Sequence, residues 1–460
     1  MPTFGSDTPF WLDRPTEAPE PPFRGEAMAD VAIVGGGFTG LWTAIQLKDA
    51  QPDLRVILLE QEVVGFGASG RNGGFVDASL THGLANGLKH FPDEIDALQL
   101  EGARNLTELT AFVRAEGIEC DLEENGFTTL ATAPYQVREF EAWLPIAARH
   151  GEVPQLWGRE RAQGEIHSPL IVGALHHADG VALVDPGRLV RGLKRAALRR
   201  GVRIHEGSPV TGLERAGSGV RVRVAGASGA IASERVVVAT SAYSGWLRRL
   251  LTWFVPVYDY VLVSEPLTPE QRAAVGWARR QGLEDATTRF HYFRLTADDR
   301  ILWGGWDAIY HWRNGVGPRH DARPVTFDLL DRQFRAFFPQ LADLGWSHRW
   351  GGPIDTTSNF TVTFGNLMGG RVLYALGYTG LGVAASRWAG GVVRDMLLRP
   401  ESDLLRLRFV RAKPWPIPPE PLRSLGVAVM QREIARADDH EGRKGLVLRF
   451  LESLGIGFDS

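Results

Sequence analysis

Three glycines between two apolar runs could bind a dinucleotide. Residues 30–40 read DVAIVGGGFTG, which predicts a buried strand that runs into Gly35, Gly37 and Gly40 before a helix. In this spacing the first glycine permits a tight turn, the second lets the backbone approach a pyrophosphate, and the third lets the helix pack close to the strand. The N-terminus of that helix would direct free N–H groups at the phosphates. Taken alone, the motif also fits an ordinary glycine-rich turn.

A carboxylate follows at the distance that ribose recognition requires. Residues 55–60 read RVILLE, so a second apolar strand ends on Glu60, which could accept hydrogen bonds from an adenosine ribose. A carboxylate at this position would repel a 2′-phosphate, which argues against NADP. The two strands, the helix pattern between them and the acid together predict a dinucleotide site.

Two further glycine-rich loops favour FAD over NAD. Residues 67–74 read GASGRNGG, and residues 377–382 read GYTGLG between a buried strand and a helix. Glycine permits close approach of a large planar cofactor, Arg71 could neutralise phosphate charge, and a helix N-terminus would face an electron-rich group. The first loop could equally be a flexible surface loop. An enzyme that binds NAD has no evident need of both loops. An enzyme that binds a cofactor with a second bulky end, such as FAD, does need them.

Properties of the whole chain exclude other classes of protein. At 460 residues the chain is too long for one core, and its net charge of −3 gives no overall field to attract nucleic acid. The basic run at 188–203 shares a helix with regularly spaced apolar residues, so we expect a solvated amphipathic face. A single cysteine, Cys120, excludes an internal disulfide. We expect a cytoplasmic protein, because no signal peptide or membrane segment is evident.

The pattern of predicted elements changes along the chain, which predicts the domain organisation. We expect an α/β protein with an α+β insert: a Rossmann-like FAD-binding domain built from discontinuous segments, joined to an antiparallel-sheet substrate domain. The expected segments are a lead-in (1–28), the FAD-binding domain (29–90, 160–250 and 351–400), a cap and substrate domain (91–159 and 251–350), and a tail with helices (401–460).

The inserted sheet should supply the groups that meet a substrate. Residues 290–306 alternate about Asp298 and Asp299, which predicts a hairpin. Period-two alternation places Tyr292 and Arg294 on one face, where Arg294 could bind a carboxylate and Tyr292 could form a wall. Arg294 could equally face solvent. Tyr258 is a weaker candidate, and Tyr378 in the last glycine loop a better one. The histidines at 176 and 177 lack a third ligand, so no metal site is expected.

Several segments carry a resemblance to a known family. They read PFWLDRP, DVAIVGGGFTGL, GFGASGRNGG, VDPGRLVRGL, YFRLTADDRILWGG, RWGGPIDTT and ALGYTGLGVAASRWAG, and they extend from about residue 10 to 400. With them the chain resembles the D-amino acid oxidase superfamily of FAD-dependent amine oxidoreductases. Within it the chain is most similar to the glycine oxidase/D-amino acid dehydrogenase-like group, and particularly to γ-glutamylputrescine oxidoreductase-type proteins.

The resemblance implies a role for each cofactor-binding candidate. The ADP half would be held by Gly35, Gly37, Gly40 and Glu60, the pyrophosphate and flavin by Ser69, Arg71, Asn72, Gly73 and Gly74, the adenine by the backbone of Val210, and the rest of the flavin by Thr240, Gly377, Thr379, Gly380 and Leu381. Some relatives attach FAD through a cysteine in the C-terminal half, or a histidine near the GASGRNGG loop. Neither occurs here, so we expect non-covalent FAD.

The implied reaction is oxidation of a C–N bond in a small amine or amino acid. Hydride would pass to flavin N5, the imine would hydrolyse, and oxygen would reoxidise the flavin. Relatives similar to sarcosine oxidase place a lysine beside the flavin to promote the oxygen reaction. All five lysines here lie outside the predicted substrate domain. A dehydrogenase that passes electrons to a quinone or another carrier therefore stays open, as does a flavoprotein with a non-amine or macromolecular substrate.

Overall fold

Short apolar strands form the parallel centre of an eight-stranded sheet. The computed structural model describes residues 4–14, 17–226, 229–438, 440–446 and 448–449. The parallel strands are, in spatial order, β9 (Arg203–His205), β3 (Val56–Leu59), β2 (Ala27–Val34), β12 (Ala230–Val238) and β19 (Val372–Leu376). The strands β10 (Val210–Ala216), β11 (Gly219–Val224) and β18 (Thr363–Leu367) extend the sheet with antiparallel pairs. Every residue of β3 and β19 is buried, as a sheet covered on both faces requires.

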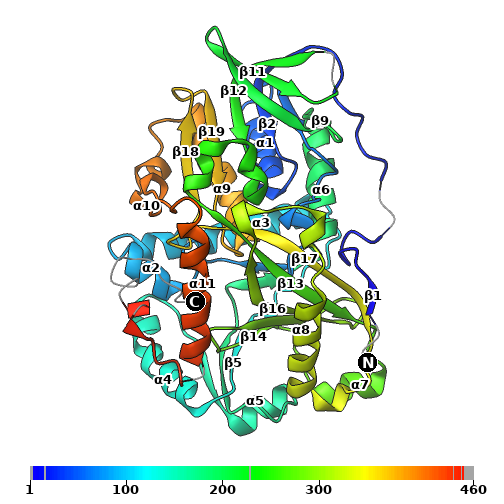
Figure 1. Cartoon of the computed structure of the whole chain (residues 1–460), viewed down its shortest axis with the longest axis vertical. Helices are drawn as coiled ribbons and strands as arrows, with labels where there is room; N and C mark the ends of the chain where they lie inside the picture. Colours follow the sequence, from blue (N-terminus) through cyan, green and yellow to red (C-terminus); the bar gives the residue numbers. More distant parts are fainter. Residues whose placement is uncertain (1–3, 15–16, 227–228, 439, 447, 450–460) are drawn as a thin grey trace.

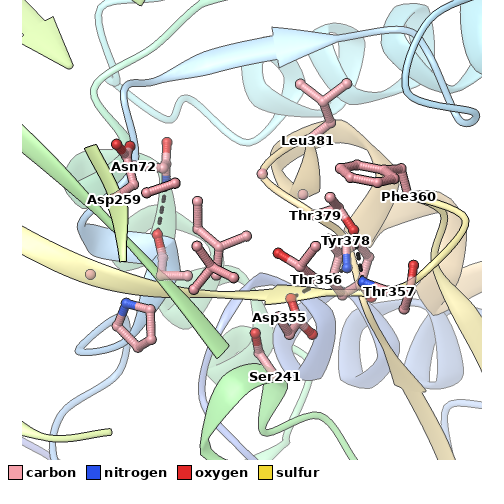
Figure 2. A pocket seen from close by; sticks show the side chains of 18 of the residues that line it. Asn72, Ser241, Asp259, Asp355, Thr356, Thr357, Phe360, Tyr378, Thr379 and Leu381 are labelled. Carbon is pink, nitrogen blue, oxygen red and sulfur yellow. Dashed lines mark hydrogen bonds between the residues drawn. The ribbon is translucent and has the colours of Figure 1, made fainter. Parts of the chain in front are cut away.

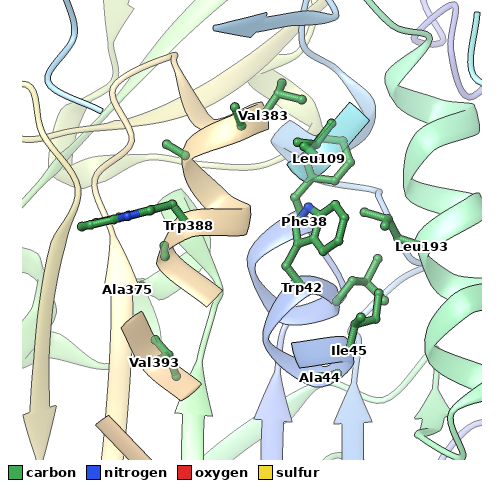
Figure 3. Packing of buried hydrophobic residues seen from close by; sticks show 14 of the residues in the cluster. Phe38, Trp42, Ala44, Ile45, Leu109, Leu193, Ala375, Val383, Trp388 and Val393 are labelled. Carbon is green, nitrogen blue, oxygen red and sulfur yellow. The ribbon is translucent and has the colours of Figure 1, made fainter. Parts of the chain in front are cut away.

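Four helices cover one face of this sheet. They are α1 (Phe38–Ala50), α3 (Ile95–Ala115), α6 (Pro186–Arg199) and α9 (Gly382–Leu398). Figure 3 shows the core between them, where Trp42 of α1 lies among Leu109 of α3, Leu193 of α6 and Val383 of α9. α1 and α9 approach closely because Gly390 has no side chain: a Cβ there would lie 3.0 Å from the backbone nitrogen of Thr43. The predicted amphipathic helix at 188–203 is α6, whose apolar residues are buried.

A nine-stranded sheet forms the other half of the molecule, below the first in Figure 1. Its strands are, in spatial order, β1 (Phe4–Ser6), β17 (Trp346–Thr356), β13 (Val255–Ser264), β16 (Ile301–Tyr310), β15 (His291–Leu295), β14 (Gly282–Asp285), β5 (Phe127–Ala131), β7 (Gly173–His177) and β6 (Gln155–Gly158). β15 and β16 pair antiparallel through the turn at Asp298 and Asp299, so the predicted hairpin is confirmed.

Helices and a small ribbon complete this half. They are α2 (Leu84–His90), α4 (Pro134–Arg149), α5 (Arg159–Glu165), α7 (Pro269–Val275), α8 (Pro324–Phe337), and the two-stranded ribbon of β4 (Phe75–Asp77) and β8 (Val181–Leu183). Phe293 and Trp303 of the hairpin face α8, where Phe334 and Phe337 close an aromatic core. The predicted α/β fold class is confirmed. The inserted sheet is mostly antiparallel, as predicted, but the pairs β1–β17 and β14–β5 are parallel.

Sheet membership suggests how the domains divide. β6 and β7 join the nine-stranded sheet although they surround residue 160, and β17 continues past residue 350. We therefore propose that the cofactor domain resumes near β8 and again after β17, later in the chain than the sequence pattern suggested. The tail contributes α10 (Arg408–Arg411) and α11 (Leu422–Asp438), and its predicted end at 450–460 lies outside the described residues.

The helices of the described residues are too short or too polar to cross a membrane.

The close approach of α1 and α9 generates a prediction about stability. We expect Gly390→Ala to lower the free energy of unfolding by about 1–2 kcal/mol relative to Gly391→Ala, because the new methyl group meets fixed backbone. At Gly391 the new methyl group meets only the side-chain oxygen of Gln46, 3.1 Å away, which can move. Urea denaturation of the two variants gives the comparison, and equal stability would contradict the packing argument.

Candidate functional site

A cavity of about 970 Å³ lies between the two sheets and collects most of the predicted site residues. It reaches from the glycine turn after β2 to the inner strands of the nine-stranded sheet. The predicted residues that line it are Gly35, Gly37, Glu60, Ser69, Arg71, Asn72, Gly73, Val210, Thr240, Tyr292, Tyr378, Thr379, Gly380 and Leu381. Those that do not line it are Gly40, Gly74, Gly377, Tyr258 and Arg294.

The glycine turn leaves the N-terminus of α1 open to this cavity. Gly35 has a φ of +113°, and a Cβ at Gly35 or at Gly40 would collide with backbone. A Cβ at Gly37 would lie 2.9 Å from Ser69 Oγ, which accepts a hydrogen bond of 2.8 Å from the Phe38 N–H. A polar oxygen therefore already occupies the first turn of α1, where phosphate oxygens bind in dinucleotide folds.

Glu60 is held by backbone amides at the end of β3. Its Oε2 accepts from the Gly36 N–H at 2.6 Å and its Oε1 from the Glu62 N–H at 3.0 Å. Burial raises the pKa of Glu60 above its ordinary value. Each carboxylate oxygen can accept a second hydrogen bond. The carboxylate lines the cavity and has the acceptor capacity that a ribose hydroxyl needs.

The loop at 67–74 is fixed by its own asparagine. Asn72 Nδ2 donates to the carbonyls of Ala68 and Ser69 at 2.9 and 3.0 Å, and its Oδ1 accepts from the Gly74 N–H at 2.8 Å. The indole of Trp11 donates to the Asn72 carbonyl at 2.8 Å. These bonds argue against a flexible surface loop, which was the alternative from sequence. Any side chain at Gly73 would meet the ring of Tyr292.

Arg71 has a different setting from the one expected. Its Nη1 forms an ion pair of 2.6 Å with Asp321 and also donates to the Gly351 carbonyl, and its Nε donates to Phe66. The guanidinium lines the cavity, but its charge is already compensated by a carboxylate. Arg71 therefore joins the 67–74 loop to β17, and its role toward a phosphate stays a prediction.

The last glycine loop is oriented by Asp355, at the end of β17. Asp355 Oδ2 accepts from the Gly377 N–H at 2.6 Å, and its backbone carbonyl accepts from the Thr379 N–H at 3.2 Å. Figure 2 shows Asp355, Thr379 and Tyr378 grouped beneath the loop that carries Leu381, just before α9 begins. Burial raises the pKa of Asp355 to about 6, although the hydrogen bonds oppose this. No motif in the sequence indicated that Asp355 orients this loop.

A tyrosine and a carboxylate meet on the wall formed by the nine-stranded sheet. Tyr292 donates from its hydroxyl to Asp259 Oδ2 at 2.5 Å, and the Tyr260 N–H donates to Asp259 Oδ1 at 2.8 Å. Burial raises the pKa of Asp259 to about 6. Both side chains line the cavity, and Figure 2 shows Asp259 beside Asn72. Period-two alternation explains the arrangement: Asp259 faces the cavity because its neighbours Tyr258 and Tyr260 face the core.

Two of the substrate-binding candidates do not reach the cavity. Arg294 is 1% exposed, and its guanidinium donates to the carbonyls of Val184, Gly74 and Leu295 at 2.7, 3.3 and 3.1 Å. It shares a strand face with Tyr292, as predicted, but its guanidinium binds backbone carbonyls and does not line the cavity. Tyr258 is fully buried and its hydroxyl bonds with the backbone of Gly317. Both side chains hold segments of the backbone in place through these hydrogen bonds.

Carboxylates other than the predicted site residues also line the cavity. Burial raises the pKa of Glu284 to about 7 and that of Asp77 to about 6. Glu284 accepts from the Thr129 hydroxyl at 2.9 Å, and neighbouring Asp285 bonds with His291 Nδ1 at 2.6 Å. β14 pairs with β5, which brings Glu284 to Thr129, whereas Asp77 comes from the separate ribbon of β4 and β8. These segments are distant in the chain, so no local sequence signal could have found this group.

The tail also takes part in the cavity. The residues concerned are Trp415, Pro416, Ile417, Pro418, Arg423, Gly426, Val427, Met430, Gln431, Ile434, Gly442 and Lys444. The sequence suggested no role for residues 401–460, and it placed every lysine away from the substrate domain. Lys444 does lie outside the predicted substrate domain, but the tail carries it to the same cavity as Tyr292 and Asp259.

These features define a dinucleotide-cofactor protein whose cofactor cavity is closed by a second sheet. The residues fit FAD: glycines keep the cavity clear at Gly37 and Gly73, a helix N-terminus opens onto it, and the Glu60 carboxylate lines it at the end of β3.

Comparison with known proteins gives the family. A family model described as "DAO: FAD dependent oxidoreductase" matches residues 30–396. The chain therefore belongs to the DAO family of FAD-dependent oxidoreductases, and FAD is its cofactor. It is 30% identical to the gamma-glutamylputrescine oxidoreductase of Escherichia coli over 376 residues, which cover 80% of this chain and 83% of that protein.

Solved structures share the fold. The glycine oxidase of Geobacillus kaustophilus superposes with a TM-score of 0.70 at 22% identity, covering 84% of this chain and 99% of that one. The L-amino acid deaminase of Proteus vulgaris superposes with a TM-score of 0.65 at 18% identity, covering 88% and 97%. At these identities the likeness establishes the architecture alone.

The position of Arg294 generates a prediction. We expect Arg294→Met to lower the free energy of unfolding by about 2–4 kcal/mol, because buried carbonyls lose their donor. The ratio of KM values for carboxylated and uncharged amines should not change. Urea denaturation and steady-state kinetics measure the two effects, with Arg221→Met at an exposed strand position as the control. Selective loss of carboxylated substrates would restore the substrate-binding role.

Proposed function

We propose that this protein oxidises the C–N bond of a small amine or amino acid. The observation that carries the proposal is the single cavity that runs from the ribose carboxylate Glu60 to the Tyr292–Asp259 pair, in a chain of the DAO family. Bound FAD supplies a two-electron acceptor for the hydride on the carbon next to the nitrogen. The imine product then hydrolyses to a carbonyl compound.

The residues of the chain orient the substrate and manage its charge. Asp259 presents a carboxylate that can attract an ammonium ion and accept its proton, and the Tyr292 hydroxyl holds one carboxylate oxygen in place. The loop at 377–381, fixed by Asp355, directs the N-terminus of α9 at the cavity. A helix N-terminus stabilises nearby negative charge, which reduction of a flavin generates.

Two features support non-covalent FAD. Cys120 does not line the cavity, and burial raises the pKa of its thiol to about 12, so it offers no reactive thiolate there. His82 does line the cavity, but its Nε2 bonds with the Thr379 carbonyl at 3.0 Å. Acid precipitation that releases all of the flavin into the supernatant would support this part of the proposal.

The electron acceptor has two candidates. The sequence-based argument against oxygen was that every lysine lies outside the predicted substrate domain, and it loses force because Lys444 of the tail lines the cavity. A quinone or another carrier stays the alternative. The rate at which air reoxidises the anaerobically reduced flavin separates the two. Reoxidation in seconds indicates oxygen, and reoxidation in hours indicates another carrier.

Anaerobic reduction of the flavin tests the proposed function directly. We expect at least one compound from a panel of amino acids, N-methyl amino acids, diamines and γ-glutamylated amines to bleach the absorption near ~450 nm. The bleaching should follow saturation kinetics, because it needs a bound substrate. A bound flavin that no amine reduces would contradict the proposal and indicate another donor.

The raised pKa of Asp259 generates a pH prediction. Because its pKa is about 6, the carboxylate loses its charge as the pH falls from 7 to 5, and attraction for an ammonium ion weakens. We expect the Kd from anaerobic flavin reduction to rise about tenfold over this range, which is about 1.4 kcal/mol. Asp259→Asn should bind weakly at pH 7 and show no further change down to pH 5.

A matched variant identifies the titrating group. The Tyr292 hydrogen bond lowers the pKa of Asp259, so Tyr292→Phe should move the same transition to higher pH. If Asp259→Asn retains the full transition, another cavity carboxylate such as Glu284 is responsible, and the role proposed for Asp259 is wrong.

A further inference from the structure

One face of α11 lies against the flavin cavity. The residues of α11 that line the cavity are Arg423, Gly426, Val427, Met430, Gln431 and Ile434. Their spacing of three and four places them along a single helix face. Leu422, Leu425 and Val429 lie outside that set and are exposed. In Figure 1, α11 crosses the front of the molecule beside the strands of the lower sheet.

The segment is fastened to the nine-stranded sheet at both ends of α11. Before the helix, Glu420 accepts hydrogen bonds from the Tyr310 hydroxyl at 2.5 Å and from the Arg313 N–H at 3.0 Å. At its end, Asp438 accepts from the backbone of Thr288 at 2.9 Å and from Arg289. These contacts fix the distance between α11 and the edge of the cavity.

A contact in the middle of the helix fixes its rotation. Gln431 donates from its side chain to the carbonyl of Ala308, and Ile434 packs against Trp306 of the same strand, β16. Arg423 is likewise bonded, to Asn314 Oδ1 at 2.6 Å and to the Leu251 carbonyl at 3.2 Å. The polar side chains on the cavity face of α11 are thus engaged with the protein itself.

What α11 presents to the cavity is therefore apolar. Half-buried Val427 and Met430 and buried Ile434 supply the surface. Gly426 is exposed at the edge of the cavity and leaves open space there, because a Cβ would have no atom within 4 Å. The wall provided by the nine-stranded sheet carries Asp259 and the Tyr292 hydroxyl. An amine bound between the two walls would place its nitrogen on the acidic side and its carbon skeleton on the α11 side.

We propose that the segment at 415–438, which lies beyond the family domain, is the specificity wall of the active site. Its apolar face limits the size of the group that the amine carries, and Gly426, Met430 and Ile434 set that limit. The inference rests on the proposed amine oxidation, because it assigns the substrate side of that same cavity.

Substitution of Gly426 offers a test that does not depend on disrupting the fold. Gly426→Leu replaces an interior helical glycine with a better helix former, so we expect Tm and FAD content to be unchanged or higher. With N-alkylglycines from N-methyl to N-butyl, anaerobic flavin reduction should slow at least tenfold for the longest members and less than twofold for the shortest. Met430→Ala should shift the preference toward longer members.

Leu425→Phe is the matched control, since it enlarges a neighbouring side chain on the opposite face of the same helix. Its substrate profile should equal that of the wild type. If Gly426→Leu changes the rate of flavin reduction by the same factor for every substrate, or changes it for none, α11 is not the specificity wall.

A measurement without substrate separates this inference from the proposed function. Acrylamide quenching of the fluorescence of bound FAD should fall in Gly426→Leu and stay unchanged in Leu425→Phe. If no amine reduces the flavin of the wild-type protein, the proposed amine oxidation is wrong. Weaker quenching in Gly426→Leu would still support α11 as a wall of the cavity. Equal quenching in both variants would overturn it.

Discussion

The bond between Asp355 and the loop at 377–379 joins the two halves of this molecule. Asp355 ends β17 of the nine-stranded sheet, whereas the amides that it accepts belong to the turn between β19 and α9 of the other sheet. Burial disfavours this carboxylate unless the amides compensate it. The shape of the cavity depends on this contact, because the loop at 377–381 and the nine-stranded sheet line it from different halves of the molecule.

Much of the cofactor half follows from local chemistry, which is why the sequence predicts it. Gly35, Gly37 and Glu60 lie where strand, turn and helix geometry place them, and these elements are contiguous in the chain. The hairpin about Asp298 also follows from alternation and turn residues. In each case the determining interactions lie within about thirty residues.

The substrate half is harder to predict because it is assembled from distant segments. Alternation separates Asp259 from Tyr258 and Tyr260, but it does not say which of the two faces meets the cofactor. Arg294 lies on the predicted face and yet stops short of the cavity, since the backbone at Gly74 and Val184 takes its hydrogen bonds. Such outcomes depend on which strands become neighbours.

The order of elements along the chain adds a consequence for assembly. Among the described elements, α11 comes after every strand of both sheets, so a ribosome delivers it once the rest of the cavity can already form. An early folding intermediate would hold an open trough in place of an enclosed site. Cofactor loading would be fastest in that interval, and docking of α11 would then trap the bound flavin.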